Sequence, residues 1–129
     1  MLVWTDNHTA TGATTGALYD PARDRWTSIT PGPAIGDFLS RPLWTGSALL
    51  AWERNSAGGQ VPDRGIAYNP ARDSWRILPR APLASRNGLG RIGVAVVWTG
   101  TEALIWSSWT GAAQDAPFTD GAAYRPAEL

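Results

Sequence analysis

The sequence contains no cysteine and no lysine, and its 129 residues include a single histidine. Without cysteine the chain can form no disulfide framework, no thiolate metal site and no thiol nucleophile. The one histidine, His8, has no serine or carboxylate at a spacing that fixes a partner, so we interpret residues 6–8 as an exposed turn. The residues therefore predict no metal, no cofactor and no catalytic group within this chain, and they favour a protein that is not an enzyme by itself.

Charge of one sign and long apolar runs are missing as well. Eleven arginines balance eleven acidic residues, giving a net charge of zero, so no strong field attracts nucleic acid or an anionic membrane surface. The longest apolar run is far below the roughly 20 residues that a membrane span needs, and no basic segment precedes an apolar one at the N-terminus. We therefore expect neither membrane insertion nor a signal peptide. With 43% apolar residues, the length fits one small packed domain over residues 1–129.

What the sequence does have is an internal repeat. The segment GALYDPARDRW at 16–26 returns as GIAYNPARDSW at 65–75 and, in shorter form, as GAAYRP at 121–126. The segment WTGSALLAW at 44–52 returns as WTGTEALIW at 98–106, and its last residues resemble LVW near the start of the chain. A period of about 50 residues with short strand-like segments is typical of propeller blades rather than of helical solenoids.

Glycine and proline interrupt the chain about every ten residues, and apolar runs such as VAVVW at 94–98 favour strands over helices. We read each unit as four successive antiparallel strands. The expected strands cover 2–5, 16–19, 25–29, 39–44, 48–53, 65–68, 74–78, 91–98, 102–107 and 121–124. This pattern predicts an all-β fold with a partial unit at 1–30, a complete unit at 37–79 and a second partial unit at 90–129.

The turns between these strands have a physical basis in the sequence. In both Trp-Thr-Gly motifs the glycine can adopt the positive φ that a tight hairpin needs at no steric cost. In the other turn, Asp20 or Asn69 precedes proline, where its side chain can bond the turn backbone while proline presets φ. Asp24 and Asp73 lie at the far side of the same turn, and we interpret them as turn-forming rather than catalytic residues.

The two motifs, in their order, resemble the bacterial type of the kelch-repeat family, also described as galactose-oxidase-like β-propellers. Blades of that family often read W-T-G-x-E-x-L-x-W and then G-x-x-Y-D-P-x-x-D-x-W, which residues 98–106 and 16–26 fit. The chain departs from the family after the second strand of a unit, where residues 53–54 and 107–108 replace Gly-Gly. Its third unit also lacks the final Asp and Trp.

The resemblance implies four-stranded antiparallel kelch-type β-propeller blades, of which this chain holds about two and a half, so the propeller is incomplete. The remaining blades of a longer protein, or a second copy of the chain, are needed to cover its open edges. Propellers of this appearance are often exported, so the resemblance favours a secreted or periplasmic location. Galactose oxidases hold copper with two His and two Tyr, one of them cross-linked to Cys, whereas this chain has one His and no Cys.

Seven of the eight tryptophans occupy repeat-equivalent positions, and Trp109 alone lies outside the repeat. Each blade of a propeller buries the same surface against its neighbour, so repeated indoles are expected in the interfaces between blades. We therefore expect the repeated residues to be structural rather than ligand-binding. The residues expected in this structural role are Gly16, Tyr19, Asp20, Trp26, Trp52, Gly65, Tyr68, Asn69, Trp75 and Trp106.

The segments that differ between the units are the candidates for ligand binding. In an antiparallel blade, the turns after the first and third strands lie on one face of the propeller, at one end of the strands. The connections from the second to the third strand, and from one unit to the next, lie on the opposite face. Long, variable connections are where a repeated scaffold usually carries its binding residues. The candidate ligand-binding residues are Arg54, Asn55, Arg64, Arg86, Asn87 and Trp109.

Three functions fit these observations, and a fold alone does not decide between them. The first is a non-catalytic binding scaffold whose variable connections contact a protein or a glycan. The second, implied by the resemblance, is a fragment of a carbohydrate-active enzyme related to galactose oxidases or sialic-acid epimerases, with its active residues in other blades. The third is a structural piece with no ligand of its own.

Overall fold

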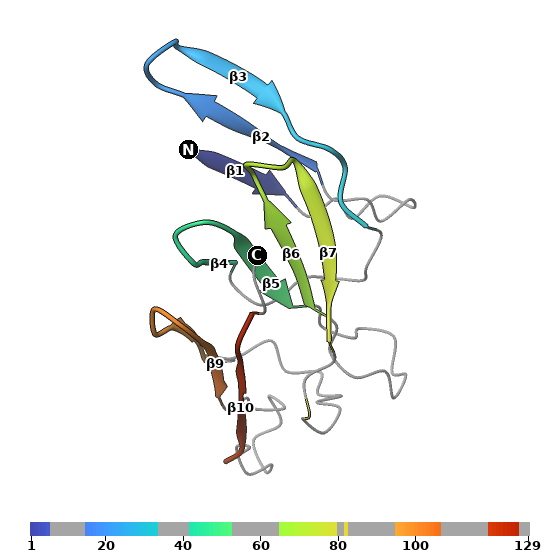
Figure 1. Cartoon of the computed structure of the whole chain (residues 1–129), viewed down its shortest axis with the longest axis vertical. Helices are drawn as coiled ribbons and strands as arrows, with labels where there is room; N and C mark the ends of the chain where they lie inside the picture. The colour runs from blue at the N-terminus through green and yellow to red at the C-terminus, as the bar shows by residue number, and fades with distance from the viewer. Residues whose placement is uncertain are drawn as a thin grey trace, which may run out of the picture.

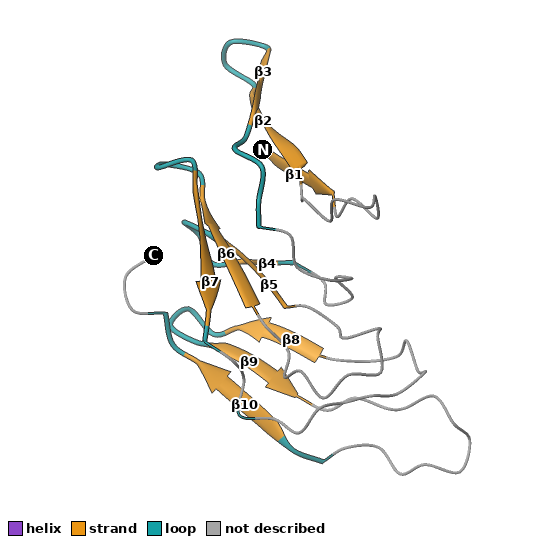
Figure 2. Ribbon diagram, turned by 90° about the vertical axis from the view of Figure 1, so that its right-hand side faces the viewer, coloured by secondary structure: helices purple, strands orange, loops and turns teal. Residues whose placement is uncertain are grey.

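The computed structural model describes residues 1–5, 15–33, 42–52, 65–79, 82, 95–106 and 119–126. Over these residues the protein is all-β, with three antiparallel sheets and no helix (Figure 1, Figure 2). This part of the chain accordingly holds no helix long and apolar enough to cross a membrane. The predicted all-β class is therefore confirmed.

Each sheet is an up-and-down meander in which every strand pairs with the next one in the chain. The first sheet contains β1 (Leu2–Thr5), β2 (Thr15–Asp20) and β3 (Arg25–Ser28). The central sheet contains β4 (Leu43–Trp44), β5 (Leu49–Trp52), β6 (Gly65–Asn69) and β7 (Ser74–Leu78). The third sheet contains β8 (Ala95–Trp98), β9 (Ala103–Trp106) and β10 (Gly121–Tyr124). All of these described strands overlap the ranges expected from the sequence.

The hairpins that open the central and third sheets turn on glycine. Gly46 and Gly100 have φ of 100° and 102°, in the region that residues with a side chain rarely adopt. Beside the first of them, Thr45 Oγ1 accepts the backbone N–H of Ala48 at 3.0 Å. Thr99 Oγ1 accepts the N–H of the corresponding residue, Glu102, at 3.1 Å. Both threonines thus replace a backbone acceptor in closing the turn.

The turns after β2 and β6 are closed by the same kind of side-chain hydrogen bond. Asp20 Oδ1 accepts the backbone N–H two residues later at 3.0 Å, and Asn69 Oδ1 does the same at 2.9 Å. Asp24 and Asp73, at the far side of these turns, have φ of 47° and 45°. Aspartate tolerates this left-handed backbone better than most residues, because its short side chain can bond locally.

The three sheets stack face to face, with the central sheet between the other two (Figure 2). All four residues of β5 are buried, and so are the first four residues of β6. Neighbouring residues of a strand point to opposite faces, so burial of successive residues requires cover on both faces of the sheet. The core therefore lies in two layers, one on each face of the central sheet.

Side chains from alternate strand positions fill the two layers. The layer between the central and third sheets contains Leu50, Trp52, Ala67, Leu78, Ala103 and Ile105. The layer between the first and central sheets contains Ile29, Leu49, Ala51, Ile66 and Tyr68, with Trp4 packed against it. Removal of these apolar side chains from water is the main force that holds the stack together.

Candidate binding surfaces

The residues expected to bind a ligand lie outside the described residues; they are Arg54, Asn55, Arg64, Arg86, Asn87 and Trp109. The structure does show at which end of the sheets the connections between the second and third strands of a unit start. β5 ends at Trp52 and β6 begins at Gly65, and these two residues pair in register at the end of the sheet opposite the short turns. Trp106 and Gly121 pair in the same way in the third sheet. These variable connections therefore start and end at the end of the sheets opposite the short turns.

The repeated glycine and the repeated tryptophan face each other on neighbouring strands, as Gly65 of β6 and Trp52 of β5 do in the central sheet. A Cβ at position 65 would lie 2.8 Å from Trp52 Nε1 and 2.9 Å from Leu78 Cδ1. The indole of Trp52 therefore requires glycine at this position. The same pairing recurs in the first and third sheets, as Trp4 with Gly16 and Trp106 with Gly121.

The repeated tyrosine packs beside a second repeated tryptophan. The ring centroids of Tyr68 and Trp75 are 4.8 Å apart with a tilt of 40°, and those of Tyr19 and Trp26 are 5.0 Å apart with a tilt of 39°. Tyr68 is fully buried in the layer between the first and central sheets. Trp26 is exposed on the first sheet. The Tyr68–Trp75 pair thus lies between two sheets, whereas the equivalent Tyr19–Trp26 pair lies on the outer face of the first sheet.

A tyrosine–aspartate hydrogen bond joins β2 to the turn that follows it in the first sheet, and β6 to the turn that follows it in the central sheet. The Tyr68 hydroxyl donates to Asp73 Oδ1 at 2.7 Å, and the Tyr19 hydroxyl donates to Asp24 Oδ1 at 2.8 Å. Burial and the hydrogen bond to Asp73 raise the pKa of Tyr68, and the hydrogen bond to Asp24 is the main cause that raises the pKa of Tyr19. Both hydroxyls therefore keep their protons at neutral pH and act as donors.

Asp73 also binds the segment that follows the first sheet, a role that sequence reasoning missed. Thr30, two residues after β3, donates its backbone N–H to Asp73 Oδ1 at 2.9 Å and its hydroxyl to Oδ2 at 2.7 Å. Trp75 Nε1 donates to the Thr30 carbonyl at 2.7 Å. The Thr30 N–H, the Tyr68 hydroxyl and the Thr30 hydroxyl together lower the pKa of Asp73. Thr30 carries no repeat signal, because the equivalent position in the next unit holds Pro79.

The outer face of the third sheet carries exposed apolar side chains at positions that are buried in the central sheet. Trp106 occupies the repeat position of Trp52, yet Trp106 is 57% exposed and Trp52 only 5%. Trp52 is covered by the third sheet, where its ring meets Tyr124 edge-on at 6.1 Å. Val97 and Leu104 are exposed beside Trp106 on the same face. The position in the stack, not the residue type, decides whether this surface is covered.

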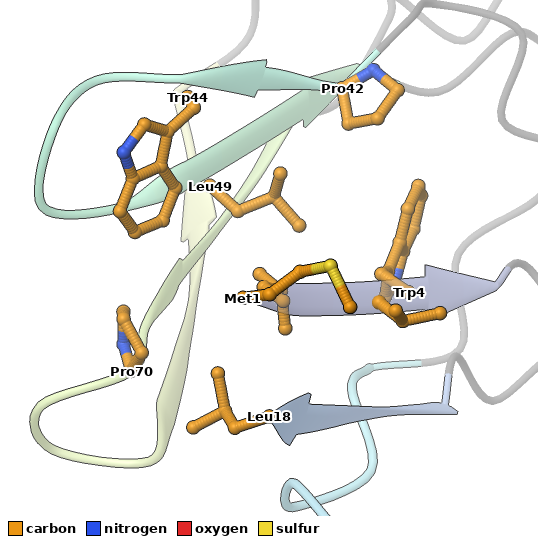
Figure 3. Close-up of a pocket in the computed structure, with 9 residues that line it drawn as sticks. Met1, Trp4, Leu18, Pro42, Trp44, Leu49 and Pro70 are labelled. Atoms are coloured by element: carbon orange, nitrogen blue, oxygen red, sulfur yellow. The ribbon is translucent and has the colours of Figure 1, made fainter. Parts of the chain in front are cut away.

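An apolar pocket of about 800 Å³ opens between the first and central sheets (Figure 3). Trp44 and Leu49 of the central sheet and Met1 of the first sheet point into the same space in Figure 3. The residues that line it all have apolar side chains: Met1, Leu2, Val3, Trp4, Leu18, Pro42, Trp44, Leu49 and Pro70. Such a lining suits an apolar side chain and would leave a buried charge without a partner.

The charged side chains of the described residues include two ion pairs at the surface. No group of three His, Cys, Asp or Glu side chains within the described ranges could hold a metal ion. Arg23 pairs with Asp20 at 2.8 Å and Arg125 pairs with Glu102 at 2.8 Å, all on exposed surface. The Arg23 guanidinium, helped by a backbone N–H, lowers the pKa of Asp20. Exposed ion pairs of this kind contribute little to stability.

No family model and no curated protein sequence matches the chain. Its function is therefore inferred from its own residues and their arrangement.

Proposed function

We propose that the chain is a segment of a kelch-type β-propeller and serves as a non-catalytic scaffold that binds a protein or a glycan. The observation that carries this proposal is the burial of the central sheet on both faces. Repeat-equivalent residues take part in the two interfaces. Trp4 of the first sheet packs on the central sheet, and Trp52 of the central sheet packs on the third. Sheets that stack through the same surface each time are the building plan of a propeller.

The outer faces of the two end sheets support a longer stack. The first sheet exposes Val3 and Trp26, and the third sheet exposes Leu104 and Trp106. The residues at the equivalent positions of the central sheet pack against its neighbours. Exposed apolar surfaces on a soluble protein usually mark a site of interaction. A further sheet at each end would bury these side chains as the chain already buries Trp52.

In this proposal the ligand binds at the end of the sheets opposite the short turns. The connections that start there differ between units in length and sequence, while the turns at the other edge repeat. Variable segments on a constant scaffold are the usual carriers of specificity. Arg54, Arg86 and Trp109 belong to these segments, and arginine and tryptophan are among the side chains that most often dominate a binding surface.

Binding to a panel of immobilised glycans tests the ligand-binding part of the proposal. Arg54→Ala, Arg86→Ala and Trp109→Ala are expected to weaken binding about tenfold where they contact the ligand, with unchanged circular dichroism and melting temperature. Thr101→Ala, in a short turn at the opposite edge, is the matched control and should bind as the wild type does. Equal binding by all of these variants would contradict the assignment of the edge, and a panel without any ligand would contradict a glycan partner.

A further inference from the structure

The two interfaces of the stack are held together by different kinds of contact. Between the central and third sheets an apolar cluster includes Leu50, Trp52 and Ile105, and β4 contacts β8 there. Between the first and central sheets there is also an apolar layer, but Thr30 adds three hydrogen bonds to it. Apolar contacts are non-directional, whereas hydrogen bonds require one geometry. The first interface therefore contains a directional joint.

The segment that contains Thr30 is attached to both sheets (Figure 1). Ile29 donates its backbone N–H to the Gly16 carbonyl in β2 at 3.2 Å, and its buried side chain belongs to the cluster of Leu49 in the central sheet. The next residue, Thr30, donates its N–H and its hydroxyl to Asp73 in the turn after β6. Movement of the first sheet away from the central one must therefore break the contacts of one of these two successive residues.

Asp73 is held in place by its own sheet. Its turn is closed by Asn69 Oδ1, which accepts the backbone N–H of Ala71 at 2.9 Å. The hydroxyl of Tyr68, a fully buried residue, donates to Asp73 Oδ1 at 2.7 Å. A group that its neighbours already orient loses little freedom when it binds a further partner, and hydrogen bonds to a carboxylate are stronger than those between neutral groups. The Asp73 carboxylate is thus a prepared acceptor for both donors of Thr30.

The repeat separates the joint from the ordinary role of an aspartate in this turn. Asp24, the equivalent of Asp73 in the first sheet, has a φ of 47° and accepts the hydroxyl of Tyr19 in the same way. That position therefore forms the turn and the tyrosine bond in both sheets, and the bonds to Thr30 are an addition at Asp73. Pro79, the equivalent of Thr30 after the central sheet, has neither an N–H nor a hydroxyl to donate.

We infer that Asp73 is a positioning residue that controls a local opening of the stack. When its bonds to Thr30 break, the first sheet separates from the central sheet, while the central and third sheets stay packed on each other. In a repeated structure each unit contacts only its neighbours, so one interface can open before the whole chain unfolds. This opening concerns the contact between two sheets, and it does not depend on the ligand proposed for the variable connections.

Cysteine labelling of the whole 129-residue chain measures the opening of each interface separately. The chain has no cysteine of its own, so a single introduced thiol reports on one position. Ala51→Cys places the thiol in the first interface, where position 51 packs against Trp4, and Ala103→Cys places it in the second. Both alanines are 0% exposed, so each thiol reacts with the reagent DTNB when its surroundings open. At low reagent concentration the labelling rate is proportional to the open fraction.

Asp73→Ala is expected to raise the labelling rate at position 51 about tenfold or more, because it removes a charged acceptor and leaves the donors of Thr30 without it. The rate at position 103 should change by no more than about twofold. Asp24→Ala is the matched control, because it removes the equivalent carboxylate and its tyrosine bond from the first sheet. Both labelling rates in Asp24→Ala should also stay within about twofold of those in the parent chains.

Thr30→Val tests the joint from its other side and leaves the turn of Asp73 intact. It removes the hydroxyl donor alone, so labelling at position 51 should rise about threefold or more, and this comparison decides the matter if Asp73→Ala does not fold. In the Asp73→Ala background the same change should add little, because the bond is already lost. Equal acceleration at positions 51 and 103 overturns the inference, because the bonds then stabilise the chain as a whole. An unchanged rate at position 51 overturns it as well.

Discussion

At position 65 the residue type is dictated by a neighbour across the strand ladder. Gly65 pairs in register with Trp52 and with Leu78, and those two side chains occupy the space that a Cβ would need. Trp52 has little freedom to move, because it is packed between the central and third sheets. A methyl group at position 65 must therefore displace a buried side chain in a close-packed interior.

Replacing Gly65 with alanine is expected to lower the free energy of unfolding by about 1–3 kcal/mol, the usual effect of overpacking a core. Urea denaturation followed by tryptophan fluorescence measures it. The double variant Gly65→Ala/Leu78→Ala removes one of the two obstructing side chains, so its loss of stability should be smaller than the sum of the two single losses. Strict additivity would contradict the steric explanation.

The contribution of Asp73 to stability is expected to depend on pH. The Thr30 N–H, the Tyr68 hydroxyl and the Thr30 hydroxyl lower the pKa of Asp73, so this carboxyl binds a proton less readily in the folded state than in the unfolded one. The contribution is present above the unfolded pKa of about 3.9 and is lost as the pH falls through the lower folded value. Melting temperatures from neutral to acidic pH should therefore fall less steeply for Asp73→Asn than for the wild type.

Asp24→Asn is the matched control for this prediction. Asp24 has the equivalent position and φ in the first sheet and accepts the Tyr19 hydroxyl. Within the described residues it receives no hydrogen bond from a neighbouring sheet, unlike Asp73. Asp24→Asn should therefore lower the melting temperature at neutral pH less than Asp73→Asn does. A wild-type acid profile for Asp73→Asn would show that the bonds to Thr30 do not stabilise the protein in solution.

At the scale of the element, β5 and β9 are the same strand of the repeat in two different settings. Leu50 of β5 is 0% exposed, whereas its equivalent Leu104 of β9 is 39% exposed. β5 lies between two sheets, and β9 has a described neighbour on one face only. Two strands of similar sequence therefore contribute unequally to stability.

Leu50→Ala is expected to lower the free energy of unfolding by about 2–5 kcal/mol, because it leaves a cavity between the central and third sheets. Leu104→Ala, the same change at the equivalent position, should cost about 1 kcal/mol or less, because its side chain is already partly in water. Denaturation of the two variants under one set of conditions measures the difference. Equal losses would mean that another sheet or another molecule covers the outer face of the third sheet in solution.

The sequence predicts the strands and turns well because each is coded locally and then repeated. The strand ranges, the positive φ of Gly46 and Gly100 and the turn bonds of Asp20 and Asn69 all follow from short motifs. Contacts between units have no such code, which is why the bonds between Thr30 and Asp73 escaped prediction. The propeller, the unit boundaries and the ligand-binding residues stay predictions.

Exposure was equally hidden from the repeat pattern. Trp52 and Trp106 occupy one motif position, and the motif alone cannot tell which of them has a neighbouring sheet. The pocket beside Trp44 has the same origin, because among the described strands only the central and third sheets contain the opening strand of the unit. Sequence reasoning placed the indoles in interfaces, and only the stacking order separates the covered positions from the open ones.

At the scale of the whole molecule, the stack has two unlike ends. The outer face of the first sheet carries Tyr19 and Trp26, and the equivalent pair in the central sheet packs against the sheet before it. The outer face of the third sheet carries Trp106, whose equivalent Trp52 packs against the sheet after it. Because each end face corresponds to one of the two covered faces of the central sheet, we expect the two end faces to fit each other. An association through them is head-to-tail rather than isologous.

This asymmetry predicts a mixing experiment. The isolated chain should self-associate as its concentration rises, which sedimentation velocity measures, because head-to-tail contact buries the exposed apolar side chains of both faces. Trp106→Arg and Trp26→Arg each place a charge in one face, so each variant alone should remain monomeric with an unchanged fold. An equal mixture keeps one intact contact, between the Trp106 face of the second variant and the Trp26 face of the first. It should therefore form dimers and nothing larger. A mixture that stays monomeric, or single variants that still associate, would contradict stacking through these faces.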